Sequence, residues 1–251
     1  MRLLRLRNFL ISACALAALT ASPAAAITGG QPDGNAHPYV AFVGDPNPPR
    51  PFCTGVVIDP TTVVTGAHCF STPGLLVLVF PDGPRASAPI PGIWLPNPAF
   101  CAACSPGLVG FATHDVAVVK LMAPLSLLRY AQLPELGATE ELGNQTPVTL
   151  VGYGVQDFLK SGPGKPVPTT DFIRTQATGE LGTAGAKLAD EFLKVKLNHG
   201  GFCLGDSGGP VLQGDTVLAI NSFLTNDRCA GVGYAYRLDT PEAQSFIAAN
   251  R

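Results

Sequence analysis

The chain has 251 residues, which suits one medium-sized domain or two small ones, and 46% of them are hydrophobic. That composition supplies a core and excludes a chain disordered throughout. Only 14% of residues are charged, whereas 28 glycines and 24 prolines make up about a fifth of the chain, which favours short strands over a helical bundle. The net charge of −2 gives no basic surface for nucleic acid or an anionic membrane.

Residues 1–26 resemble a secretory signal peptide: a basic start, an apolar stretch and then Ala24–Ala26. Ser12 and Pro23 interrupt the stretch well short of the ~20 apolar residues that a membrane anchor needs. We therefore predict an exported protein that is secreted and free of the membrane after signal removal. Cys14 follows too short an apolar run for a lipoprotein signal core and is assigned to the signal peptide, with lipid attachment as the alternative.

Short runs rich in Val, Ile and Thr, bounded by Gly, Pro and Asp, predict an all-β barrel or sandwich. The predicted strands are Tyr39–Val43, Val56–Ile58, Thr62–Thr65, Leu75–Phe80, Val116–Leu121, Val148–Val151, Val217–Ser222 and Tyr234–Leu238. The glycines of Leu133–Thr146 favour a crossing there, so that 27–135 and 136–251 form two halves. Ala184–Lys196 has some helical character and is left unassigned.

The C-terminus carries the signals of a helix. Thr240 is the expected N-cap, Pro241 occupies the first helical position and Glu242 follows in the first turn.

Six cysteines remain once the signal peptide is removed: Cys53, Cys69, Cys101, Cys104, Cys203 and Cys229. An even number in an exported chain predicts disulfides, although six cysteines allow fifteen pairings. A metal site would need a second Cys-x-x-Cys or a histidine pair near Cys101–Cys104, and the sequence has neither.

Three segments carry the chemistry: Thr65–Cys69 (TGAHC), His114–Leu121 (HDVAVVKL) and Cys203–Pro210 (CLGDSGGP). Each segment alone could have a purely structural role, but together they supply His68, Asp115 and Ser207. A serine needs a base to become a nucleophile, imidazole is suited to that task, and a carboxylate fixes its tautomer.

The glycines around the serine suggest a second element of the site. They allow a tight turn in which the N–H groups of Gly205 and Ser207 face one point, as an oxyanion hole requires.

With these motifs and Ile27-Thr28-Gly29-Gly30 at the expected mature start, the sequence resembles the chymotrypsin/trypsin family of serine endopeptidases from Ile27 to Arg237. The resemblance implies two six-stranded antiparallel Greek-key barrels, with the active site in the cleft between them. It also implies hydrolysis of protein or peptide substrates without metal or organic cofactor. A monomer is expected, with a protein protease inhibitor as an alternative partner to substrates and no nucleic acid.

The resemblance further implies disulfides Cys53–Cys69 and Cys203–Cys229, the second beside the specificity pocket. Cys101 is then left for Cys104, in a tight loop that does not match the common family pattern.

In the implied pocket, Gly201 forms the base, while Leu224 and Val232 line the walls. Ser222, Phe223 and Leu224 are expected to pair with the substrate backbone. Bulky aliphatic walls predict small or medium apolar residues before the cleaved bond.

The resemblance also implies an activating ion pair between the free ammonium of Ile27 and Asp206. Because Ala26 directly precedes Ile27, signal cleavage there would itself create this terminus.

Two other functions are weighed against an endopeptidase. Gly205–Gly209 also fits the G-x-S-x-G of esterases, whose histidine follows the serine. No histidine follows Ser207 in this chain, so that hydrolase fold is excluded. The second alternative function is that of a binding protein, which keeps the fold of the family but does not catalyse a reaction. His114 is expected to point away from its neighbour Asp115 and to be non-catalytic.

Overall fold

The computed structural model describes residues 27–45, 52–105, 111–159, 167–182, 191–197, 200–226 and 228–251. The predicted signal peptide, with Cys14, lies outside these residues. Among the residues described, no helix has the length and apolar character needed to cross a membrane.

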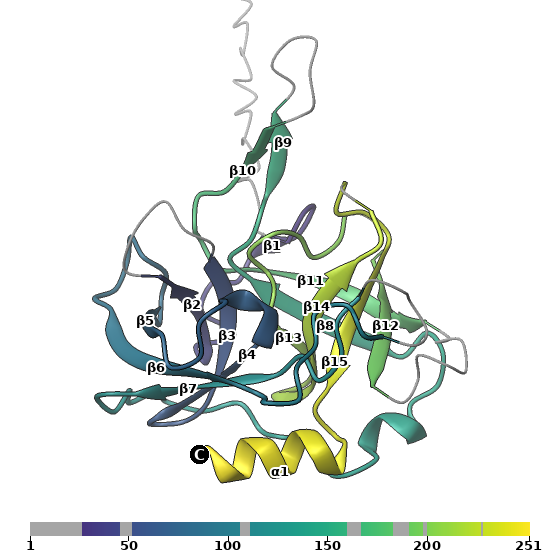
Figure 1. The fold of residues 1–251 in the computed structure, drawn as a ribbon. Coiled ribbons are helices and arrows are strands. Elements are labelled where there is room, and N and C mark those ends of the chain that lie inside the picture. The colour runs from purple at the N-terminus through teal and green to yellow at the C-terminus, as the bar shows by residue number, and fades with distance from the viewer. Residues whose placement is uncertain are drawn as a thin grey trace, which may run out of the picture.

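The first half of the chain forms a closed antiparallel barrel of six strands, in blue and teal at the left of Figure 1. Its strands are β2 (Val40–Gly44), β3 (Phe52–Asp59), β4 (Thr62–Thr65), β5 (Leu76–Phe80), β6 (Ile90–Pro96) and β7 (Ala117–Leu121). They pair in the order β2-β3-β4-β7-β6-β5, and β5 returns to β2.

The second half forms another six-stranded antiparallel ring, in green and yellow at the right of Figure 1. Its strands are β8 (Pro147–Gly152), β11 (Thr175–Gly182), β12 (Phe192–Lys196), β13 (Pro210–Gln213), β14 (Thr216–Leu224) and β15 (Val232–Arg237). The order is β8-β11-β12-β15-β14-β13, and β13 pairs with β8 to close it. The predicted boundary at 135/136 falls between the two sets of strands.

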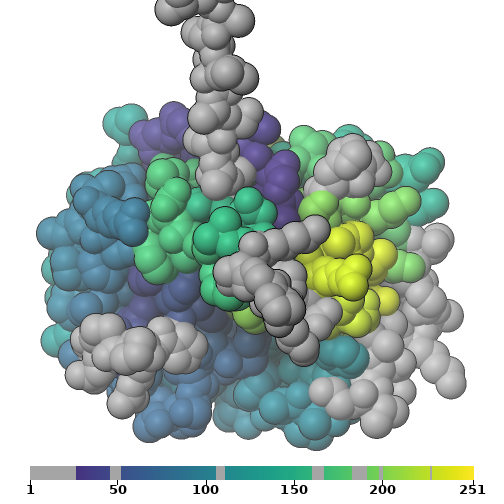
Figure 2. Space-filling model, turned by 90° about the horizontal axis from the view of Figure 1, so that it is seen from above, coloured from purple at the N-terminus to yellow at the C-terminus, as the bar shows by residue number. Residues whose placement is uncertain are grey.

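Strand β1 (Gln31–Pro32) belongs to the N-terminal segment but pairs with β11 of the second ring. In the view from above, the purple N-terminal segment accordingly lies beside green residues of the second half (Figure 2). The start of the described chain is therefore held by the second barrel.

The remaining elements are short. They are the 3₁₀ turns η1 (Ala67–Cys69) and η2 (Ala138–Glu141), the hairpin of β9 (Asp157–Leu159) with β10 (Val167–Thr169), and helix α1 (Pro241–Ala249). The hairpin projects from the body of the molecule (Figure 1). The predicted C-terminal helix is confirmed, and the Thr240 side chain accepts a hydrogen bond from the Ala243 amide.

The predicted fold class, two six-stranded barrels followed by a helix, is confirmed. All eight predicted strands overlap observed ones. Strands β6, with two prolines and a glycine, and β11, with two glycines, are not predicted because these residues are unusual inside a strand. The end of the unassigned stretch, Phe192–Lys196, is strand β12.

The described residues contain three disulfides. Cys53–Cys69 and Cys203–Cys229 are the pairs that the family resemblance implied, and Cys101–Cys104 is the pair that then remained.

A buried arginine joins the two barrels to the N-terminal segment. The Arg174 side chain is 7% exposed, and its Nε donates to Asp33 Oδ2 over 2.9 Å. Its Nη1 donates to the carbonyls of Val40 and Pro81 in the first barrel and to the Tyr153 hydroxyl in the second. Satisfying so many acceptors with one guanidinium fixes these segments relative to one another.

Candidate active site

His68 and Asp115 meet at one end of two paired strands. Thr65, at the end of β4, lies opposite Ala117, at the start of β7, so the residues just beyond these positions are neighbours. His68 Nδ1 lies 2.7 Å from Asp115 Oδ2, and the His68 amide donates to Asp115 Oδ1 over 2.9 Å. The Ser222 hydroxyl also donates to Asp115 Oδ2. Both carboxylate oxygens are therefore held.

The electrostatics of this pair favour an ionised carboxylate beside a basic imidazole. Burial acts to raise the pKa of Asp115, but the His68 charge and the hydrogen bonds from His68 and Ser222 hold it below its usual range. Burial acts to lower the pKa of His68, and the Asp115 charge and hydrogen bond raise it above its usual value. Such an imidazole takes up a proton more readily than a free one.

The loop that carries Ser207 is fixed by Thr54, a fully buried residue of β3. The Thr54 amide donates to the Ser207 carbonyl and its hydroxyl to the Gly205 carbonyl, both over 2.9 Å. The Cys53–Cys69 disulfide ties the same strand to the turn that holds His68. Strand β3 thus anchors both the serine loop and the histidine turn.

Close backbone packing brings these two segments together. A Cβ atom on Gly208 would lie 2.2 Å from Thr65 Oγ1 and 2.6 Å from the Gly66 nitrogen, and its φ of +75° also favours glycine. Only glycine lets the residue after Ser207 pack directly against the chain that leads into His68.

The amides of Gly205 and Ser207 have no protein acceptor among the described residues. Gly205 has a φ of +94°, a backbone conformation that residues other than glycine rarely adopt. Two unpaired N–H groups beside a serine can stabilise a negatively charged oxygen.

Asp206 is fully buried directly before the serine. Its carboxyl group accepts hydrogen bonds from the amides of Gly154 and Cys203, each over 2.8 Å. Burial nevertheless raises the pKa of Asp206 well above its usual value, although these hydrogen bonds act in the opposite direction. A cation placed beside this carboxyl would favour its ionised form.

Ile27 is also fully buried, and its backbone nitrogen donates to Thr175 Oγ1 over 2.7 Å. Thr175 lies opposite Gly152 in the pairing of β11 with β8. A Cβ atom on Gly152 would lie 2.1 Å from Asp206 Oδ1. The start of the described chain and the buried carboxyl therefore flank the same pair of strands.

The residues expected to bind substrate lie along β14 and around the Cys203–Cys229 disulfide. Leu224, two residues after the Ser222 that contacts Asp115, packs beside that disulfide. Gly201 is buried, and a Cβ atom there would lie 2.7 Å from the Cys229 carbonyl oxygen. Val232 begins β15 and is half-buried.

Phe223 has an aromatic ring on each side. Its ring stacks on those of Phe111 and Tyr234, with centroid separations of 4.3 and 5.0 Å. This stack makes the edge of β14 beside Asp115 apolar and rigid.

Sequence reasoning missed Thr54 and Thr175, which hold the serine loop and the Ile27 nitrogen. A threonine in a strand carries no local signal for such a role, because its partners come from distant segments. The glycines at 152 and 154, which make room for Asp206, follow a predicted strand and are the one hint available.

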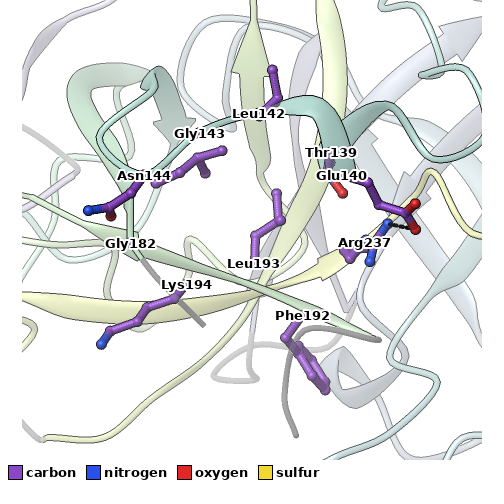
Figure 3. Close-up of a pocket in the computed structure, with 11 residues that line it drawn as sticks. Thr139, Glu140, Leu142, Gly143, Asn144, Gly182, Phe192, Leu193, Lys194 and Arg237 are labelled. Carbon is purple, nitrogen blue, oxygen red and sulfur yellow. Dashed lines mark hydrogen bonds and ion pairs between the residues drawn. The ribbon is translucent and has the colours of Figure 1, made fainter. Parts of the chain in front are cut away.

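Two other features do not add to this site. Atoms of Cys53, His68 and Cys69 lie within 4.8 Å of one another, but the cysteines form a disulfide and offer no thiolate to a metal. A pocket of about 240 Å³ lies on the second barrel, where Glu140, Lys194 and Arg237 line it (Figure 3). None of the candidate site residues described above lines this pocket.

Comparison with known proteins agrees with this geometry. The trypsin family model matches residues 26–245. A trypsin of Sarcophaga bullata is 26% identical over 215 residues, which are 78% of this chain and 77% of that protein. Brachyurin of Leptuca pugilator is 24% identical over 225 residues, covering 86% and 96%. The solved structure of HL collagenase superposes with a TM-score of 0.67 at 18% identity, covering 89% and 98%.

Proposed function

Because this chain belongs to the trypsin family and is a serine-type endopeptidase acting on proteins or peptides, we propose that Ser207, His68 and Asp115 carry its reaction. The observation that supports this assignment is the pair of hydrogen bonds between His68 and Asp115, next to the loop of Ser207. A binding protein without catalysis has no need for this arrangement.

In the proposed reaction, Ser207 Oγ attacks the substrate carbonyl carbon while His68 Nε2 takes the hydroxyl proton. Asp115 holds Nδ1–H and stabilises the imidazolium. The amides of Gly205 and Ser207 donate to the oxyanion of the tetrahedral intermediate. His68 then gives the proton to the leaving amine, which leaves an acyl-enzyme on Ser207. Water, deprotonated by His68, hydrolyses that ester and restores the serine.

We propose that the enzyme prefers small or medium apolar residues before the cleaved bond. Leu224 and Val232 take up volume at the walls of the proposed pocket, and Gly201 at its base carries no charge to attract Lys or Arg. Ser222, Phe223 and Leu224 would pair with the substrate backbone as an added strand.

Cleavage of a peptide library by the form that begins at Ile27 tests both the activity and the preference. We expect products that end mainly in Ala, Val or Leu, and none from the matched His68→Ala variant. Dominant cleavage after Arg or Phe would contradict the proposed pocket. Equal activity of the His68→Ala variant would contradict the proposed triad.

We propose that activation depends on an ion pair between the Ile27 ammonium and Asp206. The fully buried Ile27, the acceptor Thr175 and the raised pKa of Asp206 support it. A buried carboxylate is costly unless it is paired, and a new ammonium on Ile27 would supply the missing cation. Signal cleavage after Ala26 would release this terminus without a second protease.

Adding two residues before Ile27 is expected to abolish nearly all activity, because the ammonium then no longer reaches Asp206. The measurement compares kcat/KM of a form that begins at Ile27 with that of a form that begins Met-Ala-Ile27 and stays uncleaved. N-terminal sequencing of both forms is the control. Full activity of the extended form would contradict the ion pair.

We further propose that the protein is secreted and acts as a monomer. The signal pattern of residues 1–26 and the three disulfides support export. A protein inhibitor that presents an extended segment to the same cleft would be a natural partner.

A further inference from the structure

The backbone around Asp115 makes a tight turn. The Val116 amide donates to the His114 carbonyl over 2.9 Å, which closes a three-residue turn with Asp115 at its centre. His114 has a φ of +52°, a left-handed conformation that is strained for a residue with a side chain. The direction of the Asp115 carboxylate depends on this turn, so contacts that hold it also hold the carboxylate.

Two acidic residues from the second half of the chain hold His114 in this conformation. Glu191, just before β12, accepts the His114 amide over 3.2 Å. Glu242, in the first turn of α1, lies with both carboxylate oxygens 2.8 Å from His114 Nδ1. The turn of the first barrel is thus fastened to the second barrel and to the C-terminal helix.

Glu242 is itself fixed by two further donors. Asn97 Nδ2, from the segment after β6, donates to Oε1 over 2.9 Å, and the Tyr236 hydroxyl of β15 donates to Oε2 over 3.3 Å. The backbone of Asn97 also pairs with Val116 beyond the turn. In the described structure, His114 is therefore bonded to Glu191 and Glu242, and Glu242 is bonded in turn to Asn97 and Tyr236.

We propose that Glu242 is a positioning residue for catalysis, acting through His114 to hold the turn that aims Asp115 at His68. This inference rests on the proposed role of Asp115. A half-exposed contact such as that between His114 and Glu242 contributes little to global stability. We therefore expect the pair to affect the position of the Asp115 carboxylate. Displacement of a catalytic group by about 1 Å can lower the rate up to ~100-fold.

The test compares Glu242→Ala and Glu242→Gln in the form that begins at Ile27. We expect Glu242→Ala to lower kcat about tenfold with KM unchanged, since the change affects the catalytic group rather than substrate binding. Glu242→Gln retains an acceptor for its neighbours and should keep most of kcat. Glu141→Ala, which removes an exposed acid from η2, is the matched control and should behave as wild type.

The pH profile gives a readout that a purely structural role would not change. Asp115 raises the pKa of His68, so a displaced Asp115 raises it less. The acidic limb of kcat/KM should then move to lower pH in Glu242→Ala. Unchanged kcat and pH limb in Glu242→Ala, or equal losses in Ala and Gln variants, would overturn the inference.

The Asp115→Asn variant separates the two possible failures. If Asp115→Asn is severely impaired while Glu242→Ala matches wild type, the positioning role alone is wrong. If Asp115→Asn retains wild-type kcat, the proposed triad itself is wrong.

Discussion

Ser207→Ala is expected to lower kcat about 10⁶-fold, leaving only what oxyanion stabilisation and substrate binding provide without a nucleophile. The Ser207 backbone is held by Thr54, and Gly208 packs tightly against the histidine turn. Loss of one hydroxyl leaves these contacts in place, so the variant should fold as wild type does. Peptide hydrolysis and thermal unfolding, measured on the same preparation, separate a loss of catalysis from a loss of folding.

Ser71→Ala is the matched control, because Ser71 is an exposed serine in a surface loop. It should keep both the activity and the melting temperature of wild type. A Ser207→Ala variant that kept more than about a hundredth of wild-type kcat would contradict a covalent role for Ser207, because the mechanism has no second nucleophile.

Arg174→Ala is expected to lower the free energy of unfolding by about 3–5 kcal/mol, because it leaves the buried Asp33 carboxylate without its cation. The lost guanidinium also leaves the carbonyls of Val40 and Pro81 without a donor. For a chain of this size, the melting temperature should fall by about 10 °C. Arg85→Ala removes an exposed arginine 3.8 Å from Asp171 and should change stability by less than about 1 kcal/mol.

The pH dependence of this loss has a defined direction. Burial acts to raise the pKa of Asp33, but hydrogen bonds from His37 and Arg174 and the Arg174 charge hold it below its usual value. The stabilisation is therefore present above the unfolded pKa and is lost as the pH falls through the folded one. Denaturant unfolding at several pH values should show that the difference in free energy of unfolding between wild type and Arg174→Ala becomes smaller in acid. A constant difference would contradict the ionic part of the explanation.

Much of the fold follows from local patterns in the sequence. The runs of β4 and β7 predict strands because they are rich in valine and lack glycine and proline. Strand β6 has two prolines and a glycine and is completed by pairing with β5 and β7 on either side. Its strand character comes from tertiary contacts, which a local pattern does not contain.

In the candidate site, too, some residues are predicted by local sequence patterns and others depend on tertiary contacts. Three short motifs predict His68, Asp115 and Ser207, since catalysis restricts both the residue types and their neighbours. The residues that hold them, Thr54 and Glu242, act through side-chain contacts 151 and 128 positions apart in sequence. Nothing in their local sequence distinguishes them from other threonines and glutamates.

A fluorophosphonate, which forms a covalent bond with a nucleophilic serine, tests the proposed acyl-enzyme chemistry most directly. The form that begins at Ile27 would be treated with the reagent, digested and mapped by mass spectrometry, with His68→Ala as a parallel sample. We expect one adduct, on Ser207, in wild type, and a much slower reaction in His68→Ala because the serine loses its base. An unlabelled Ser207, or equal labelling rates in the two proteins, would contradict a triad built on Ser207 and His68.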